Sequence, residues 1–350
     1  MKGKVSLWVK RELELCMAAV VLSMMMVFSN TAFASESESP ENTIMAEISE
    51  YVSEQYGSLS SAEQNELAEE IYQEKYVEAA IASMNVTDET DENVVDIAYQ
   101  NMIARETYIA ELISLHGGVE TTMADWEYNL NYLKNHYDEV MEMEDVNGVY
   151  VDLYIEDYEI VQATRNMPET QINGIRTRAS SYSSSDAVSY AEQYYDTYNT
   201  AYPDWTSYGG DCANFISQCL YAGGKSMKGT PGTSTAAQNW SNWFSQGSSC
   251  NTSYVSSTWR GANAFKSYWQ SNASGYSTFT SVGSSSYSYG YKGDAVSLLN
   301  SNGSAYHTLI IVGYDVANKD FIVAAHTGNT KTAHLSNYSP AGGFVIYNMR

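Results

Sequence analysis

Residues 208–224 read YGGDCANFISQCLYAGG, and this stretch decides how the second half of the chain folds. Its apolar residues recur every three or four positions, which predicts a helix of about three turns that begins at Cys212. Asp211 is a favourable N-cap residue, and the pair Gly223 and Gly224 is typical of a helix end. The apolar face of this helix needs a surface to pack on, most naturally a β-sheet.

The position of Cys212 in the first helical turn predicts a reactive thiol. Unpaired backbone N–H groups and the positive end of the helix dipole both favour the thiolate, which is the nucleophilic form. A structural interpretation stands beside this one, because free cysteine is among the most buried residue types and Cys212 opens the apolar stripe. The polar Gly-Gly-Asp sequence in front of the helix favours the reactive interpretation.

Four segments near the C-terminus alternate in the manner of β-strands and are separated by polar turns, which predicts an antiparallel sheet for the helix to pack on. His307 lies in the second of them and His326 near the end of the third. If these two strands pair across the polar turn between them, the two histidines are expected to fall nearly opposite each other. The four segments are residues 293–299, 306–314, 321–327 and 343–347.

A histidine with a second polar group beside it is the arrangement that activates a cysteine nucleophile. The alternative is again structural, since a single histidine on a strand is more often a satisfied core residue. That alternative applies more strongly to His326 than to His307. The sequence shows no group of cysteine and histidine at zinc-ligand spacing, so the expected chemistry needs no metal and no cofactor.

The motif Gly-Asp-Cys-Ala-Asn-Phe-Ile-Ser-Gln-Cys-Leu at 210–220, followed by Ala-Gly-Gly, closely resembles the nucleophile motif of the putative amidase domain family of secreted bacterial proteins. That family resembles papain-like cysteine hydrolases, alongside NlpC-type cell-wall peptidases and CHAP amidases. The resemblance covers residues 182–350. It implies an α+β catalytic domain of the papain-like type, with the nucleophile helix packed on an antiparallel sheet.

The resemblance also implies a role for individual residues. His307, in Tyr-His-Thr-Leu-Ile-Ile-Val-Gly, matches the catalytic histidine of the family, and Ala-His-Thr-Gly-Asn at 325–329 matches its later His-Thr motif. The expected mechanism therefore has Cys212 as nucleophile, His307 as general base, and His326 or alternatively Asn329 as the residue that orients the base. The backbone N–H of Cys212 is expected to stabilise the oxyanion, with Tyr208 as a candidate second donor.

The N-terminus has the features of a secretory signal peptide. Basic residues precede an apolar run over 15–28, and Ala32-Phe33-Ala34 fits the cleavage rule, so residues 1–34 are expected to be removed. The run is too short for a permanent anchor, and no other run is long enough to span a membrane. We therefore expect a secreted protein, extracellular or associated with the cell wall.

Charge divides the remaining chain into two parts. Residues 35–180 carry 32 acidic and 6 basic side chains, whereas residues 181–350 carry 8 of each. Neither part has a basic patch, so nucleic acid is not an expected partner. We expect an acidic, mostly helical domain over 35–161, a linker over 162–181 and the catalytic domain over 182–350.

The acidic domain shows helical periodicity and then a change of period. Val149, Val151, Leu153 and Ile155 alternate, which predicts that the domain ends in a strand. His116 and His136 lie on helical stretches without a second ligand at metal-binding spacing, so they are interpreted as ordinary surface or half-buried residues.

Two functions from different classes remain open at this level. The first is a cysteine amidase or peptidase acting on a peptide or amide, with peptidoglycan as one candidate substrate. The second is a binding module for a glycan or protein that kept the fold and lost the chemistry. A disulfide between Cys219 and Cys250 would spare Cys212, and neither that pairing nor the oligomeric state follows from the sequence.

Overall fold

The computed structural model describes residues 40–78, 96–164 and 182–350. The expected signal peptide, and all of the expected linker except residues 162–164, lie outside the described residues. The chain divides into two compact units, Met1–Asp88 and Glu89–Arg350.

The first unit consists of α2 (Pro40–Gln55), α3 (Ser61–Tyr72) and a short π-helix, η1 (Gln73–Glu78). A capping box begins α3. The backbone N–H of Glu63 donates to Ser60 Oγ, and the Ser60 backbone N–H donates to Glu63 Oε2 at 2.8 Å. These two bonds satisfy N–H groups that a helix start leaves unpaired, as the Ser-x-x-Glu sequence predicts.

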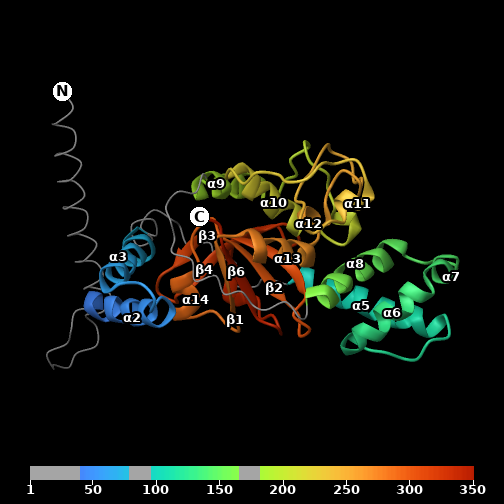
Figure 1. The fold of residues 1–350 in the computed structure, drawn as a ribbon, viewed down its shortest axis with the longest axis horizontal. Coiled ribbons are helices and arrows are strands. Elements are labelled where there is room, and N and C mark those ends of the chain that lie inside the picture. Colours follow the sequence, from blue (N-terminus) through green and yellow to red (C-terminus); the bar gives the residue numbers. More distant parts are fainter. Residues whose placement is uncertain (1–39, 79–95, 165–181) are drawn as a thin grey trace. The chain divides into compact units, whose positions relative to one another are not determined.

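The second unit is built on a six-stranded antiparallel sheet, so the α+β class is confirmed (Figure 1). The strand order is β1-β6-β2-β3-β4-β5. All four predicted strands are present, as β2 (Ala295–Leu299), β3 (Ala305–Asp315), β4 (Asp320–Ala325) and β6 (Phe344–Asn348). The two outer strands, β1 (Gly275–Phe279) and β5 (Thr330–His334), were not predicted, because their short segments carry few apolar residues.

The predicted helix at Cys212 is also confirmed. It is α10 (Cys212–Ala222), and it packs on one face of the sheet beside α9 (Ser184–Tyr194) and α13 (Ala262–Asn272) (Figure 1). Its stripe is fully buried in one cluster with residues of β2, β3 and β4. This cluster includes Phe215, Ile216 and Cys219 from the helix and Ala295, Ile310 and Ala324 from the sheet.

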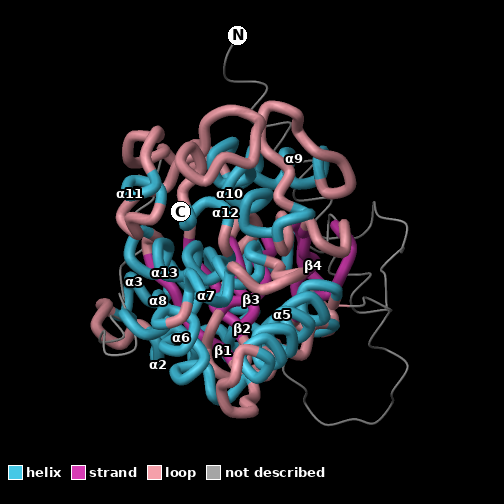
Figure 2. Tube along the Cα trace, turned by 90° about the vertical axis from the view of Figure 1, so that its right-hand side faces the viewer, coloured by secondary structure: helices cyan, strands magenta, loops and turns pink. Residues whose placement is uncertain are grey.

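Loops make up most of the chain between α10 and α12 (Ser257–Arg260), interrupted by the short helix α11 (Ser234–Ala237) (Figure 2). Aromatic side chains hold this region to the core. The Trp243 and Trp259 rings lie 4.5 Å apart between centroids, and the Trp243 indole N–H donates to Ser217 Oγ on α10 at 3.1 Å.

The rest of the second unit is helical: α5 (Ile97–Leu115), the 3-10 turn η2 (Met123–Asp125), α6 (Trp126–Asn135), α7 (Tyr137–Met141) and α8 (Gly148–Thr164). The strand predicted around residues 149–155 is therefore wrong. Val151, Tyr154 and Tyr158 are buried at helical spacing in a cluster with α5 and α6. The alternation arose because tyrosine was counted with the polar residues, whereas these tyrosines bury their rings. None of the described helices combines the length and the apolar character that crossing a membrane requires.

The compact unit Glu89–Arg350 includes residues on both sides of the expected linker, 162–181. Helices before the linker contact the sheet domain after it. Arg260 forms an ion pair with Glu156 at 3.1 Å, and Asn263 Nδ2 donates to the carbonyl of Asp157 at 2.7 Å. The Tyr306 hydroxyl donates to Asp96 at 2.9 Å. Charge composition does not report such contacts, which is why a boundary drawn from composition at 162–181 differs from this division.

Candidate functional site

Cys212 is the first residue of α10, and its side chain is only 7% exposed. Burial raises the pKa of the thiol to about 12. The backbone N–H groups of Thr308, Ala213 and Cys212 itself act in the opposite direction and lower this pKa. The donors expected at a helix start are therefore present, but burial outweighs them in this conformation.

Asp211, immediately before Cys212, does more than the sequence predicted. It stands at the N-cap position of α10, yet its side chain does not cap the helix. Its carboxylate is buried, and Oδ1 accepts hydrogen bonds from the Trp205 backbone N–H and from Asn214 Nδ2, each at 2.8 Å. Its Oδ2 lies 2.6 Å from His326 Nδ1. Asp211 is thus a site residue that sequence reasoning treated only as a cap.

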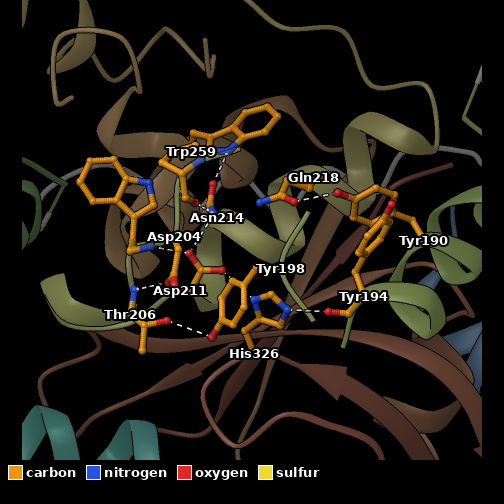
Figure 3. Close-up of polar contacts among 12 residues, drawn as sticks. Tyr190, Tyr194, Tyr198, Asp204, Thr206, Asp211, Asn214, Gln218, Trp259 and His326 are labelled. Atoms are coloured by element: carbon orange, nitrogen blue, oxygen red, sulfur yellow. Dashed lines mark hydrogen bonds and ion pairs between the residues drawn. The ribbon is translucent and has the colours of Figure 1, made fainter. Parts of the chain in front are cut away.

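His326 lies on the α10 side of the sheet, with both ring nitrogens in hydrogen bonds (Figure 3). Nδ1 faces Asp211, and Nε2 lies 2.7 Å from the backbone carbonyl of Tyr194. Both partners are acceptors, so a ring that carries a proton on each nitrogen satisfies both.

Two aromatic rings hold the His326 imidazole in this orientation. Phe215 stacks on it at 3.9 Å between centroids, and Tyr198 lies at 4.6 Å. His326 therefore contacts residues on both sides of Cys212 along α10, namely Asp211 before it and Phe215 one turn after it.

His307 faces the other side of the sheet. Along β3 the side chains alternate, and Ile310, paired with Ala295, packs in the same cluster as Cys212. His307, three residues earlier and paired with Leu298, therefore points away from α10. Neither of its ring nitrogens has a hydrogen-bond partner within the described residues. Burial lowers the pKa of His307 to about 4, against an opposing effect of the Asp96 carboxylate.

The expectation that His307 and His326 lie side by side is therefore wrong. The β3–β4 register pairs Ile310 with Ala324, and continuing it brings Thr308 opposite position 326. An irregularity between Ile311 and Gly313 shifts the register by one residue. A shift of one residue moves a side chain to the opposite face of a sheet, and counting from the turn does not reveal it.

The other two candidate residues lie at the surface. Tyr208 is 41% exposed in the 3-10 turn η3 (Thr206–Tyr208). Asn329 is exposed, with a φ of 47° in the turn between β4 and β5. Among the hydrogen bonds of the described chain, none joins Asn329 to His307, the base that it was expected to orient as the alternative to His326, and the residue bonded to His326 is Asp211.

The thiols of Cys212, Cys219 and Cys250 are all free. Cys219 is buried, and the Cys250 thiol donates to the carbonyl of Asp204 at 3.0 Å. The disulfide that the sequence left open is thus not formed in this structure.

The glycines before Cys212 allow a close approach between the start of α10 and the end of β4. Gly210 has a φ of 131°, and a Cβ at this position would lie 3.4 Å from Thr327 Oγ1. A larger residue would be strained in this backbone conformation and would crowd the residue that follows His326. The backbone conformation before Cys212 therefore explains the glycine at position 210 in the Gly-Gly-Asp sequence.

The motif, the helix and the sheet agree with a comparison to known families. Residues 181–347 match the family model described as a putative amidase domain. The match supports amide-bond hydrolysis as the activity class of this half of the chain. The matched range, 181–347, nearly coincides with the expected catalytic domain, 182–350.

A curated relative extends the same comparison. The chain is similar to the uncharacterized protein YhbB of Bacillus subtilis (strain 168), at 29% identity over 178 residues. The aligned part is 49% of this chain, which spans about half (51%) of the relative's length. No solved structure matches the chain.

Proposed function

We propose that this protein is a secreted thiol amidase in which Cys212 is the nucleophile. The Cys212 sulfur attacks the carbonyl carbon of an amide, the carbon–nitrogen bond breaks, and the leaving amine takes up the proton that the thiol loses. Water then hydrolyses the thioester. Support for the amide class comes from the family match over 181–347, and support for secretion comes from the signal-peptide features of residues 1–34.

One observation carries the choice of nucleophile. Burial and the Asp211 carboxylate raise the pKa of the Cys212 thiol to about 12, but the backbone N–H groups of Thr308, Ala213 and Cys212 act against them and favour a negative charge at this sulfur. Backbone donors that converge on one atom are also what an oxyanion next to that atom requires. A papain-like arrangement, with the nucleophile at a helix start against a sheet, is part of this proposal.

The proton acceptor in this proposal is a histidine, and two are available. His307 is the residue that the family resemblance assigns, whereas His326 is bonded to the neighbour of Cys212. To act as a base, His326 must release the Tyr194 carbonyl and carry no proton on Nε2, and losing that contact costs about one hydrogen bond, or roughly 1 kcal/mol. His307 would have to turn to the other face of β3, which disrupts its pairing with β2. We therefore assign the proton transfer to His326, oriented by Asp211, and retain His307 as the alternative.

Turnover of a defined substrate tests the proposal. Purified peptidoglycan and simple peptide amides are incubated with the full chain, and mass spectrometry detects new carboxyl and amino termini. We expect release by the wild type and none by Cys212→Ala. Cys250→Ala is the matched control, because Cys250 is also a free thiol but lies away from the start of α10, and it should keep wild-type turnover. Equal turnover by Cys212→Ala would disprove the mechanism.

A binding module on the same fold is the second candidate, and the burial of Cys212 favours it. A thiol with a pKa of about 12 is poorly nucleophilic at neutral pH unless its surroundings rearrange. Iodoacetamide at pH 6 distinguishes the candidates: faster labelling of Cys212 than of Cys250 supports the amidase. Slow labelling, together with wild-type retention of Cys212→Ala on insoluble peptidoglycan and no released fragments, supports the binding module.

A further inference from the structure

Two histidines of the helical region that are 20 positions apart in sequence meet in space. His116 follows the last residue of α5, and His136 separates α6 from α7. Their ring centroids lie 5.3 Å apart. Glu139, in the first turn of α7, completes the group, and one ligand atom from each of the three residues lies within 4.8 Å of the others.

Hydrogen bonding indicates which nitrogen of His116 faces the group. His116 Nδ1 lies 2.8 Å from the hydroxyl oxygen of Tyr132, whose own O–H donates to the His116 backbone carbonyl at 3.5 Å. With its proton directed to that carbonyl, the hydroxyl oxygen accepts a hydrogen bond from Nδ1–H, and this tautomer has its lone pair on Nε2. A second residue that holds one nitrogen of a histidine while the other binds a metal is the usual arrangement around metal-binding histidines.

Each histidine has a nitrogen at zinc-ligand spacing from one oxygen of Glu139. His116 Nε2 lies 3.5 Å from Glu139 Oε2, and His136 Nδ1 lies 3.1 Å from the same oxygen. Zinc bonds of about 2.0–2.1 Å to nitrogen and oxygen in a tetrahedron give ligand–ligand distances of about 3.3 Å. Lone pairs of imidazole and carboxylate at such distances repel each other unless a proton or a metal ion lies between them.

We propose that His116, His136 and Glu139 bind a zinc ion, with a water molecule as the fourth ligand. Two imidazoles and one carboxylate are ligands that zinc accepts. An ion can reach all three side chains from solvent, because they are 17% exposed for His116, 40% for His136 and 67% for Glu139. The ion links the end of α5 to the junction of α6 and α7. It binds the folded chain only, so it stabilises these helices. The proposal is independent of Cys212 and of the amidase function.

Calorimetric titration with ZnCl2 tests the site. The full chain, stripped with EDTA and dialysed, is titrated at pH 7.5 with Zn²⁺ alone. We expect about one equivalent to bind and the melting temperature to rise with zinc concentration. His116→Ala, His136→Ala and Glu139→Gln should each weaken binding at least about tenfold and remove most of the rise. His334→Ala is the matched control, because His334 also pairs with a carboxylate, Asp315, at 3.1 Å, but lies outside the group.

A second measurement covers the case in which a histidine variant fails to fold. Glu139 is largely exposed, so Glu139→Gln should keep the wild-type circular dichroism spectrum. Co²⁺ bound to the wild type should give the intense visible absorption of a four-coordinate ion, and this absorption should be lost in folded Glu139→Gln. The proposal is overturned if the wild type binds neither ion, or if Glu139→Gln and His116→Ala bind zinc with wild-type affinity.

Discussion

His326 and Asp211 form a buried ion pair, 2.6 Å between Nδ1 and Oδ2, that joins the end of β4 to the residue in front of Cys212. Their side chains are 2% and 1% exposed. Because α10 begins one residue later, the pair controls where the helix start, and with it the Cys212 thiol, lies against the sheet. The site is thus held by a tertiary contact between residues 115 positions apart.

Breaking this pair should strongly destabilise the protein. His326→Gln removes the Nδ1 partner of the buried Asp211 carboxylate, and a loss of about 3 kcal/mol in unfolding free energy is expected. Urea denaturation monitored by tryptophan fluorescence measures it. His334→Gln, which breaks a partly buried pair with Asp315, should cost less, about 1 kcal/mol. Equal losses in the two variants would contradict a structural role for the buried pair.

Turnover of histidine variants should separate the two candidate bases. If His326 transfers the proton, His326→Asn should reduce kcat/KM by about 100-fold or more, while His307→Asn keeps the wild-type value within a few-fold. A combination of Cys212→Ala with His326→Asn should cost little more than Cys212→Ala alone, because residues that act as a unit are not additive. If His307→Asn lowers kcat/KM more than His326→Asn does, His307 is the residue that transfers the proton. All variants are compared at temperatures well below their melting points.

His307 should make the protein acid-sensitive. Its pKa is lowered from 6.5 to about 4 by burial, so between these values the unfolded chain binds a proton that the folded chain does not. The stability that this group contributes is fully present above pH 6.5 and is lost as the pH falls towards 4. The wild type should therefore lose about 3 kcal/mol more than His307→Leu between pH 7 and pH 4. Unfolding free energies from urea titrations at both pH values measure this, and parallel losses would contradict it.

Glu106 should act in the opposite direction. Burial raises the pKa of this carboxyl to about 7, against the lowering effects of Arg105 and of the hydrogen bond from Tyr158. The folded chain therefore keeps a proton that the unfolded chain releases above pH 4.5, and stability is lost as the pH rises through 7. Relative to the wild type, Glu106→Gln should gain about 3 kcal/mol between pH 4.5 and pH 8. An unchanged difference between the two proteins across this range would show that Glu106 ionises normally.

These two groups explain why a pH profile of the wild type alone is uninformative. Between pH 4.5 and 6.5 their contributions have opposite signs and partly cancel. The single variants separate them, since each removes one titration and leaves the other in place.

Local sequence patterns were sufficient to predict the central helix and strands of residues 182–350. The helix at Cys212 and the four central strands follow from the spacing of apolar residues and from the glycines and polar residues at their ends. Where a pattern had two interpretations, sequence alone chose wrongly, as at Val151, Tyr154 and Tyr158. Whether a tyrosine counts as apolar depends on whether its ring finds a buried surface, and that surface belongs to other helices.

Tertiary structure alone decided how the functional residues are grouped. The sequence by itself determined that Cys212 begins a helix and that His307 and His326 lie on or beside strands. It did not determine the face of His307, because a shift of one residue in the β3–β4 register reverses the face without changing the local pattern. Nor did it reveal that Asp211 meets His326, or that His116 meets His136, since those contacts arise from the packing of elements that are distant in the chain.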